Sequence, residues 1–117
     1  MKDYSIAINV IAEEARAYLA EKHKAREQAL QLSRKAIRYS ANAIRAIHRN
    51  EFPEAQRLIE VVREVLQEAH QLLDGHADLY FTGFVQDAQK EYTEAQATYA
   101  FITGGPFPSP TGLRVEM

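Results

Sequence analysis

The first fifty residues contain neither of the two residue types that most often interrupt a helix. The first proline is Pro53 and the first glycine is Gly75, and the stretch before them is rich in Ala, Glu, Lys, Arg, Gln and Leu. Proline and glycine disfavour a helix interior by about 3 and about 1 kcal/mol relative to alanine. The sequence therefore predicts one long helix over residues 3–49. At about 1.5 Å per residue it projects beyond a small domain, so we expect it to lie against another chain or a longer partner.

Turn signals separate this helix from two further helices. Asn50 can end the first helix in a left-handed conformation, and Pro53 suits the first turn of the next one. The second helix is predicted over residues 53–73 with Gly75 as its cap, and the third from about Asp78 to Gly104. No stretch has the pattern of a strand. The predicted fold class is all-α, an antiparallel bundle of three helices whose first helix is very long.

Each predicted helix has an apolar face built from steps of three and four residues. The expected buried face of the first helix is Leu30, Ser33, Ile37, Ser40, Ile44 and Ile47. That of the second is Ala55, Leu58, Ile59, Val62, Leu66, Ala69 and Leu73. That of the third is Phe81, Val85, Ala88, Tyr92, Ala95, Tyr99 and Ile102. Residues 106–117 hold three of the four prolines and have no periodicity, so residues 1–105 form the predicted helical domain and the rest an extended or disordered tail.

Composition limits the possible settings of the chain. With 117 residues, 46% of them hydrophobic, the chain can bury one core. It has no cysteine, so a reducing, cytoplasmic location is the default expectation. The charged N-terminus lacks the apolar block of a signal peptide, and no apolar run is long enough to span a membrane. The formal net charge of −2 means that any binding to nucleic acid depends on a local basic patch.

A column of carboxylates lies beside the apolar face of the third helix. Asp87, Glu91 and Glu94 are spaced so that they lie roughly 90° from the centre of that face. Like charges three and four residues apart repel one another, so a helix selected for stability alone would more often place Lys or Arg among them. Such a row suits a hard divalent cation, Mg²⁺. The alternative is an ordinary acidic flank, which most amphipathic helices have.

A strip of basic residues follows the outer side of the first helix. Arg34, Arg38, Arg45 and Arg49 lie within roughly a 60° arc, about 120° from the expected buried face, and Lys35 lies at the edge of the strip. The sequence has no acidic residue between Gln28 and Asn50. Such a strip can bind a phosphate backbone. The alternative is a solubilising outer face, although such faces usually mix both signs.

Histidine offers little evidence for a catalytic or metal site. The four histidines lack the spacing of a zinc site. Arg63 and His70 have the Arg-x₄₋₆-His spacing that resembles a helical family of small ribonucleases of toxin systems. On a helix this is simply a spacing of seven residues, which occurs often by chance.

Two longer strings resemble the translin family, and most closely its prokaryotic members, which are related to translin and translin-associated factor X. They are SRKAIRYSANAIRAIHRNEFPEAQRLI and LYFTGFVQDAQKEYTEAQATYAFITGGPFPSP, and the resemblance covers about residues 25–110. It implies a helical protein that binds RNA and single-stranded DNA and assembles into hollow, usually octameric oligomers. In the factor X-like branch it also implies an Mg²⁺-dependent endoribonuclease that acts on single-stranded RNA.

The resemblance also assigns residues. The family's Glu-x-x-Glu metal ligands correspond to Glu91 and Glu94, which would be catalytic, while its second pair belongs to helices beyond Met117. We therefore expect an N-terminal half, either a fragment or a half-protein completed by a partner. The expected ligand is RNA or single-stranded DNA. The chain is expected to assemble as a homo-oligomer, or as a hetero-oligomer with another member of the family. No membrane partner is expected. The alternative function is a non-catalytic helical oligomerisation module.

Overall fold

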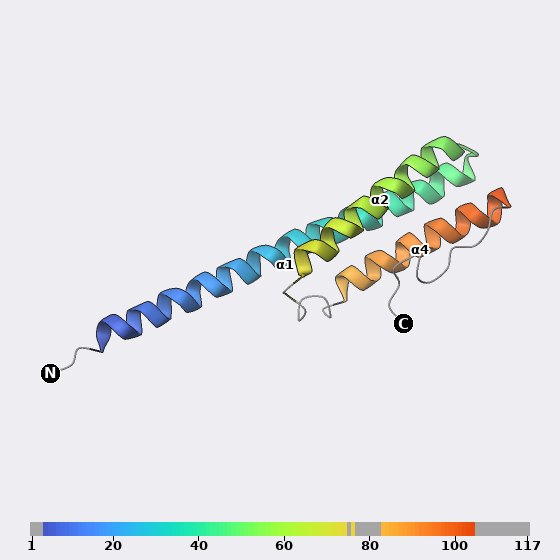
Figure 1. Cartoon of the computed structure of the whole chain (residues 1–117). Helices are drawn as coiled ribbons and strands as arrows, with labels where there is room; N and C mark the ends of the chain where they lie inside the picture. The colour runs from blue at the N-terminus through green and yellow to red at the C-terminus, as the bar shows by residue number, and fades with distance from the viewer. Residues whose placement is uncertain (1–3, 75, 77–82, 105–117) are drawn as a thin grey trace.

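The computed structural model describes residues 4–74, 76 and 83–104, and in them it contains three helices (Figure 1). These are α1 at Ser5–His48, α2 at Phe52–Leu73 and α4 at Phe84–Thr103. The described residues include no strand, which confirms the all-α class. α1 has 44 residues, which confirms the very long first helix. The predicted tail over residues 106–117 lies outside the described residues.

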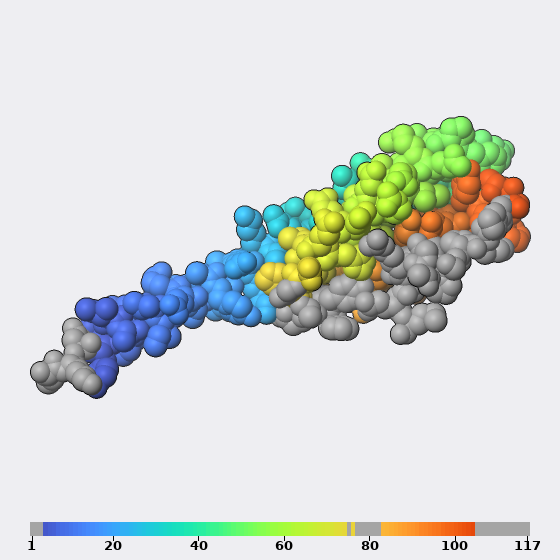
Figure 2. All heavy atoms as spheres, in the orientation of Figure 1, coloured from blue at the N-terminus to red at the C-terminus, as the bar shows by residue number. Residues whose placement is uncertain are grey.

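The three helices form a bundle from which α1 extends at one end (Figure 1). α1 and α2 form an antiparallel hairpin, and α4 packs against both, running in the direction of α1. The molecule measures 78 × 24 × 16 Å along its principal axes. Figure 2 shows why: the N-terminal part of α1 is a narrow rod that leaves a thicker body.

The turn between α1 and α2 has the predicted chemistry. Asn50 adopts a left-handed conformation with φ of 61°, and the backbone N–H of Glu51 donates to the Ala46 carbonyl at 2.9 Å. Pro53 lies in the first turn of α2. α4 ends at Thr103, close to the predicted end, and Gly104 caps it in a left-handed conformation with φ of 73°. The predicted cap at Gly75 lies outside the described residues.

The start of the third helix was predicted wrongly. α4 begins at Phe84, because Gly83 has φ of 99° and ψ of −27°. A right-handed helix cannot continue through a residue in this left-handed conformation, which glycine adopts without the steric penalty of a Cβ atom. The preceding stretch, residues 77–82 with Phe81, lies outside the described residues.

Small side chains form most of the buried face of α1. Its buried residues are Ala25, Ala29, Ser33, Ala36, Ser40, Ala43, Ala46 and Ile47. The predicted face was therefore partly wrong, since Leu30, Ile37 and Ile44 are only half-buried at its edge. The distance between packed helices depends on the side chains at the contact, so a row of Ala and Ser lets α2 and α4 approach α1 closely.

The core divides into three clusters along α1, all of them between Ala25 and Ile47. The central cluster contains Ala36, Val62, Val65, Leu66, Ala88 and Tyr92. A second cluster lies near the α1–α2 turn, with Ala43, Ala46, Ile47, Ala55, Leu58 and Ala95. The third contains Ala25, Ala29, Leu73 and Val85. Side chains of α2 and α4 thus cover only the C-terminal half of α1.

The predicted faces of the other two helices are largely confirmed. All the predicted residues of α2 are buried except Ile59, which is half-buried. In α4, Ile102 was predicted wrongly and is 46% exposed. The reason is that Tyr99, one turn earlier, already packs edge-on against Phe52 at the start of α2, with ring centroids 6.3 Å apart. Beyond that point α4 has passed the end of the hairpin.

Candidate nucleic-acid interface

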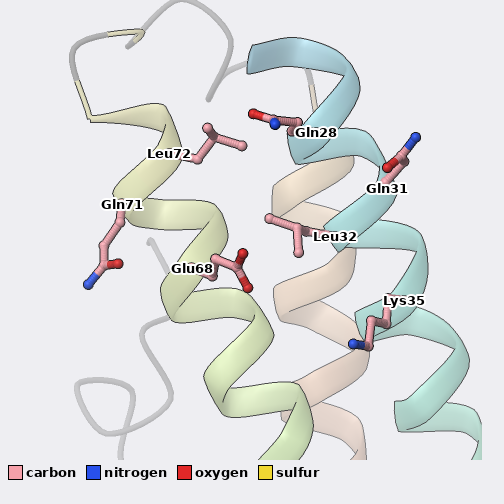
Figure 3. Close-up of a pocket in the computed structure, with 7 residues that line it drawn as sticks. All are labelled: Gln28, Gln31, Leu32, Lys35, Glu68, Gln71 and Leu72. Carbon is pink, nitrogen blue, oxygen red and sulfur yellow. The ribbon is translucent and has the colours of Figure 1, made fainter. Parts of the chain in front are cut away.

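Two hollows lie between α1 and α2. The amide hollow has a volume of about 560 Å³ and is lined by Gln28, Gln31, Leu32, Lys35, Glu68, Gln71 and Leu72 (Figure 3). The arginine hollow has a volume of about 340 Å³ and is lined by Tyr39, Asn42, Arg45, Arg49, Glu54, Arg57 and Leu58. All these residues belong to α1 or α2, except Arg49, which caps the end of α1. We call the surface that contains both hollows the α1–α2 groove.

The groove follows from the size pattern of α1. Small residues at the centre of its buried face bring the two backbones together, while longer side chains stand on the flank of each helix. In an antiparallel hairpin, residues equally far from the turn lie opposite one another, so Lys35 on α1 and Glu68 on α2 line the same hollow. The polar flanks of two amphipathic helices thereby become the two walls of one groove.

The amide hollow combines apolar and polar groups. Figure 3 shows Leu32 and Leu72 pointing toward each other across the gap, and Lys35 and Glu68 also pointing into it. No ion pair joins the lysine to the glutamate in the described residues. The hollow therefore offers an apolar contact surface with a cation and an anion at its side, which fits a flat ring that carries polar edges.

The arginine hollow gathers three guanidinium groups from two helices. Arg45 comes from α1, Arg49 caps the end of α1, and Arg57 comes from α2; Glu54 is the one acidic residue among the described residues of its lining. Arg45 donates from Nη1 to Oδ1 of Asn42 at 2.7 Å, which holds the side chain in place. Guanidinium groups bind phosphate oxygens with two parallel hydrogen bonds, so the chemistry of this hollow favours an anion.

Two of these three arginines already have carboxylate partners. Arg49 donates to both carboxylate oxygens of Glu51 at 3.2 Å, which raises the pKa of Arg49. Arg57 donates to both oxygens of Glu54 at 2.9 and 2.6 Å, which raises the pKa of Arg57 and lowers that of Glu54. Exposed ion pairs of this kind contribute only about 0–1 kcal/mol, so a phosphate can compete for these cations.

Two other cations of the predicted basic strip, Lys35 and Arg38, lie near Tyr39, which lines the arginine hollow. The Lys35 ammonium lies 5.6 Å from the centroid of the Tyr39 ring, and Cζ of Arg38 lies 5.4 Å from it. Arg34 and Arg38 are exposed, and within the described residues neither forms an ion pair. The structure thus divides the strip: Lys35, Arg45 and Arg49 line the hollows, and Arg34 and Arg38 lie on the outer surface.

The predicted carboxylates lie elsewhere, on α4. Asp87 and Glu94 are exposed, and Glu91 is half-buried. No group of three or more His, Asp or Glu side chains in the part of the chain that the structure describes could hold a metal ion. These residues alone therefore do not fit a complete Mg²⁺ site, because Mg²⁺ requires near-octahedral oxygen coordination. We derive no catalytic step from them, and their role as metal ligands stays a prediction.

Arg63 and His70 are engaged in separate contacts. Arg63 donates to Glu60 at 2.6 and 3.0 Å and to Gln67 at 3.4 Å on the exposed side of α2. Nε2 of His70 lies 2.6 Å from Nε2 of the buried Gln89, where α2 packs on α4. In the described residues the arginine pairs on the surface and the histidine joins two helices, so these contacts do not favour a ribonuclease site.

Sequence reasoning missed the residues that α2 contributes to the groove. Arg57 belongs to the arginine hollow, and Glu68, Gln71 and Leu72 belong to the amide hollow. A usable signal was present. Counting equal distances from the Asn50 turn along an antiparallel hairpin places Arg57 close to Arg45, and the amides of the two helices close to each other.

Comparisons with known protein families, with curated proteins and with solved structures find no significant match to this chain. In the residues that the structure describes, the fold and the site are those of an all-α bundle of three helices with a basic groove. Membership of the translin family stays a prediction. Among the helices of the described residues, none is both long and apolar enough to cross a membrane.

Proposed function

We propose that this chain binds single-stranded nucleic acid, RNA or DNA, along the α1–α2 groove. The observation that carries the proposal is the convergence of Arg45, Arg49 and Arg57 in one hollow, next to Lys35 and Arg38 around the Tyr39 ring. α1 has no acidic residue from Gln28 to its end, so no negative charge on this part of the helix weakens the attraction of these cations for phosphate. Because the net charge of the whole chain is −2, the attraction of a nucleic acid depends on this local basic surface, and the contact is limited to this face.

The shape and chemistry of the groove favour a single strand. Proteins that bind single strands combine a basic groove along the backbone with side chains on which bases stack. Here the arginine hollow would take phosphates, and the Tyr39 ring or the leucine floor of the amide hollow would contact a base. Exposed bases are available in a single strand and are stacked inside a duplex.

The cleavage that the translin resemblance implies is a separate matter. It requires Mg²⁺ ligands beyond Glu91 and Glu94, and the described residues contain no group of three or more that could hold a metal. The described residues that line the groove belong to α1, its cap Arg49 and α2, whereas these two carboxylates belong to α4. Binding is therefore proposed independently of catalysis, and endoribonuclease activity stays a prediction.

The test compares two variants that lose the same charge. Lys35→Ala/Arg45→Ala removes two cations that line the hollows of the groove and have no acidic partner among the described residues. The control Arg63→Ala/Lys90→Ala removes two exposed cations that line neither hollow. Fluorescence anisotropy with a labelled single-stranded RNA, repeated over a salt series, gives the affinity and its salt dependence.

We expect the groove variant to bind roughly tenfold more weakly, with the slope of log affinity against log salt reduced by about 1.4, since each phosphate contact to a single strand contributes about 0.7. The control should match the wild type. Equal losses in both variants would mean that only total charge matters, and absence of binding by the wild type at low salt would refute the proposal.

A further inference from the structure

The two hollows of the α1–α2 groove differ in charge. Among the described residues that line the amide hollow, Lys35 is the one cation and Glu68 the one anion. The lining of the arginine hollow sets three guanidinium groups against one carboxylate. A phosphate is repelled by the Glu68 carboxylate and gains little net attraction in the amide hollow. The phosphates of a bound strand therefore belong in the arginine hollow, which leaves the amide hollow to an uncharged part of the strand, a base.

One row of side chains on α1 connects the two hollows. Its members follow each other in steps of four and three residues, so they lie along one side of the helix: Gln28, Leu32, Lys35, Tyr39 and Asn42. The first three line the amide hollow and the last two line the arginine hollow. Leu32 and Asn42 are about 15 Å apart along the helix axis. A strand of a few nucleotides that binds the arginines through its phosphates can therefore place a base in the amide hollow.

The amide hollow has the size and the walls of a site for a flat ring. Its volume of about 560 Å³ lies within the range of roughly 300–1,000 Å³ that is usual for small-molecule sites. Leu32 from α1 and Leu72 from α2 are half-buried and point toward each other across the gap (Figure 3). They can contact the apolar faces of a base, so its polar edge is left to the charged groups of the hollow.

Lys35 and Glu68 point into the gap from opposite walls and have complementary hydrogen-bonding roles (Figure 3). The ammonium group only donates hydrogen bonds, and the carboxylate only accepts them. Cytosine, adenine and guanine each carry an amino group that can donate to the carboxylate, together with a ring nitrogen or carbonyl that can accept from the ammonium. Uracil and thymine have no amino group. Their pairing edge has one ring N–H between two carbonyl oxygens, which a carboxylate would meet as further acceptors.

We infer that the amide hollow is a base-selective subsite that prefers a base with an amino group to uracil or thymine. The ring lies between Leu32 and Leu72, the amino group donates to Glu68, and Lys35 donates to an acceptor of the base. This inference rests on the proposed binding of a single strand along the α1–α2 groove. It also gives a role to Glu68, whose negative charge would otherwise only weaken the binding of a polyanion.

The test compares two labelled RNA strands of the same length, one of cytosine only and one of uracil only. The two bases have the same ring size, so contact with the leucines is similar and the edge groups differ. Fluorescence anisotropy at neutral pH and one salt concentration gives both affinities. The wild type should bind the cytosine strand about three- to tenfold more tightly, as expected for a hydrogen bond to a charged group at an accessible site.

Two variants that lose the same charge locate the preference. Glu68→Gln keeps the shape of the side chain but adds an N–H that can donate to a uracil carbonyl, so the preference for cytosine should disappear. Glu64→Gln is the control, because Glu64 is exposed one turn earlier on α2 and is not among the described residues that line either hollow. It should keep the wild-type ratio of affinities. Because each ratio is taken within one protein, a general effect of charge cancels.

The outcomes separate this inference from the proposed function. Equal affinity of the wild type for the two strands would overturn the base selectivity and leave binding along the groove intact. A preference that survives in Glu68→Gln, or that is lost equally in Glu64→Gln, would overturn its assignment to the amide hollow. Absence of binding to either strand at low salt would refute the proposed function, and the inference with it.

Discussion

The two halves of α1 present the same helix face to different surroundings. From Ala25 to Ile47 this face is made mostly of Ala and Ser and is buried by α2 and α4. From Tyr4 to Leu19 it carries Tyr, Ile and Leu and is exposed. The larger, more hydrophobic side chains are therefore outside the bundle, and the smaller ones are inside it.

This difference shows that small residue size, rather than hydrophobicity, marks the part of α1 that packs on α2 and α4. Alanine and serine contribute little apolar area, but they allow close approach of the helices, and the larger residues of α2 and α4, such as Val62, Leu66 and Tyr92, then fill the core from the other side. Large residues on the same face of the N-terminal half of α1 are instead exposed.

The largest expected difference between the halves comes from removing isoleucine side-chain atoms. Ile47→Ala should lower the free energy of unfolding by about 2–4 kcal/mol, since Ile47 is 1% exposed and its loss leaves a cavity. Ile11→Ala should change the unfolding of the bundle by less than about 0.5 kcal/mol, because Ile11 is exposed. Urea denaturation followed by circular dichroism, at a concentration where the chain is monomeric, gives both values. Equal losses of unfolding free energy in the two variants would contradict the claim that only the C-terminal half of α1 is packed in the bundle.

Enlarging an alanine should separate the halves by a somewhat smaller amount. Ala43 and Ala7 lie about ten helical turns apart and therefore on the same side of α1. Ala43→Leu should destabilise the bundle by about 1–3 kcal/mol, because Ala43 is fully buried between packed helices. Ala7→Leu, at an exposed position, should be close to neutral. The same denaturation measurement checks both, and a neutral Ala43→Leu would contradict close packing along the Ala and Ser row.

Removing the carboxylate partner of an arginine should raise the affinity for nucleic acid only where that arginine lies at the packed half of α1. Glu51→Gln releases Arg49, which lines the arginine hollow, and should raise affinity for single-stranded RNA by about two- to threefold. Glu13→Gln releases Arg16 in the projecting half, where the pair is joined at 2.6 Å, and should leave the affinity unchanged. Anisotropy titrations at one fixed salt concentration measure both. If Glu13→Gln raised the affinity as much as Glu51→Gln does, RNA would bind along the whole of α1 and not only at the groove.

The smallest expected effect concerns pH. Arg57 and Arg63 lower the pKa values of Glu54 and Glu60 below the ordinary 4.5, chiefly by hydrogen bonding. A carboxyl whose folded-state pKa is lowered stabilises the fold above its unfolded-state pKa, and this contribution is lost as the pH falls through the folded-state pKa. Glu54→Gln/Glu60→Gln should therefore make thermal stability fall slightly less between about pH 5 and pH 3. Both pairs are exposed, so a large change would show that they are not simple surface pairs.

The sequence predicted much of the backbone of this fold. Absence of Pro and Gly predicted the length of α1, and Asn50, Pro53 and Gly104 marked helix ends that the structure confirms. The start of α4 was missed because a helical apolar pattern runs through Gly83, and the pattern does not report the conformation of that one residue.

Side-chain packing was less predictable, because it depends on more than one helix. Leu30, Ile37 and Ile44 were chosen for α1 on hydrophobicity, whereas three-helix packing favoured the smaller residues one position away. The basic strip could be read along one helix, but the hollow it forms with Arg57 depends on the register of the hairpin. The carboxylates of α4 have the spacing of a column, but the described residues supply no group of three or more that could hold a metal.

The central claim, that the α1–α2 groove binds single-stranded nucleic acid, is tested most directly by NMR titration of the ¹⁵N-labelled chain with a short single-stranded RNA. The side-chain Nε signals of Arg45, Arg49 and Arg57 and the backbone amides around Tyr39 should shift together and saturate at one concentration. Signals of residues 5–24 and of α4 should stay in place. Shifts concentrated on the carboxylate column of α4 or on the projecting half, with the arginine signals unmoved, would contradict the claim.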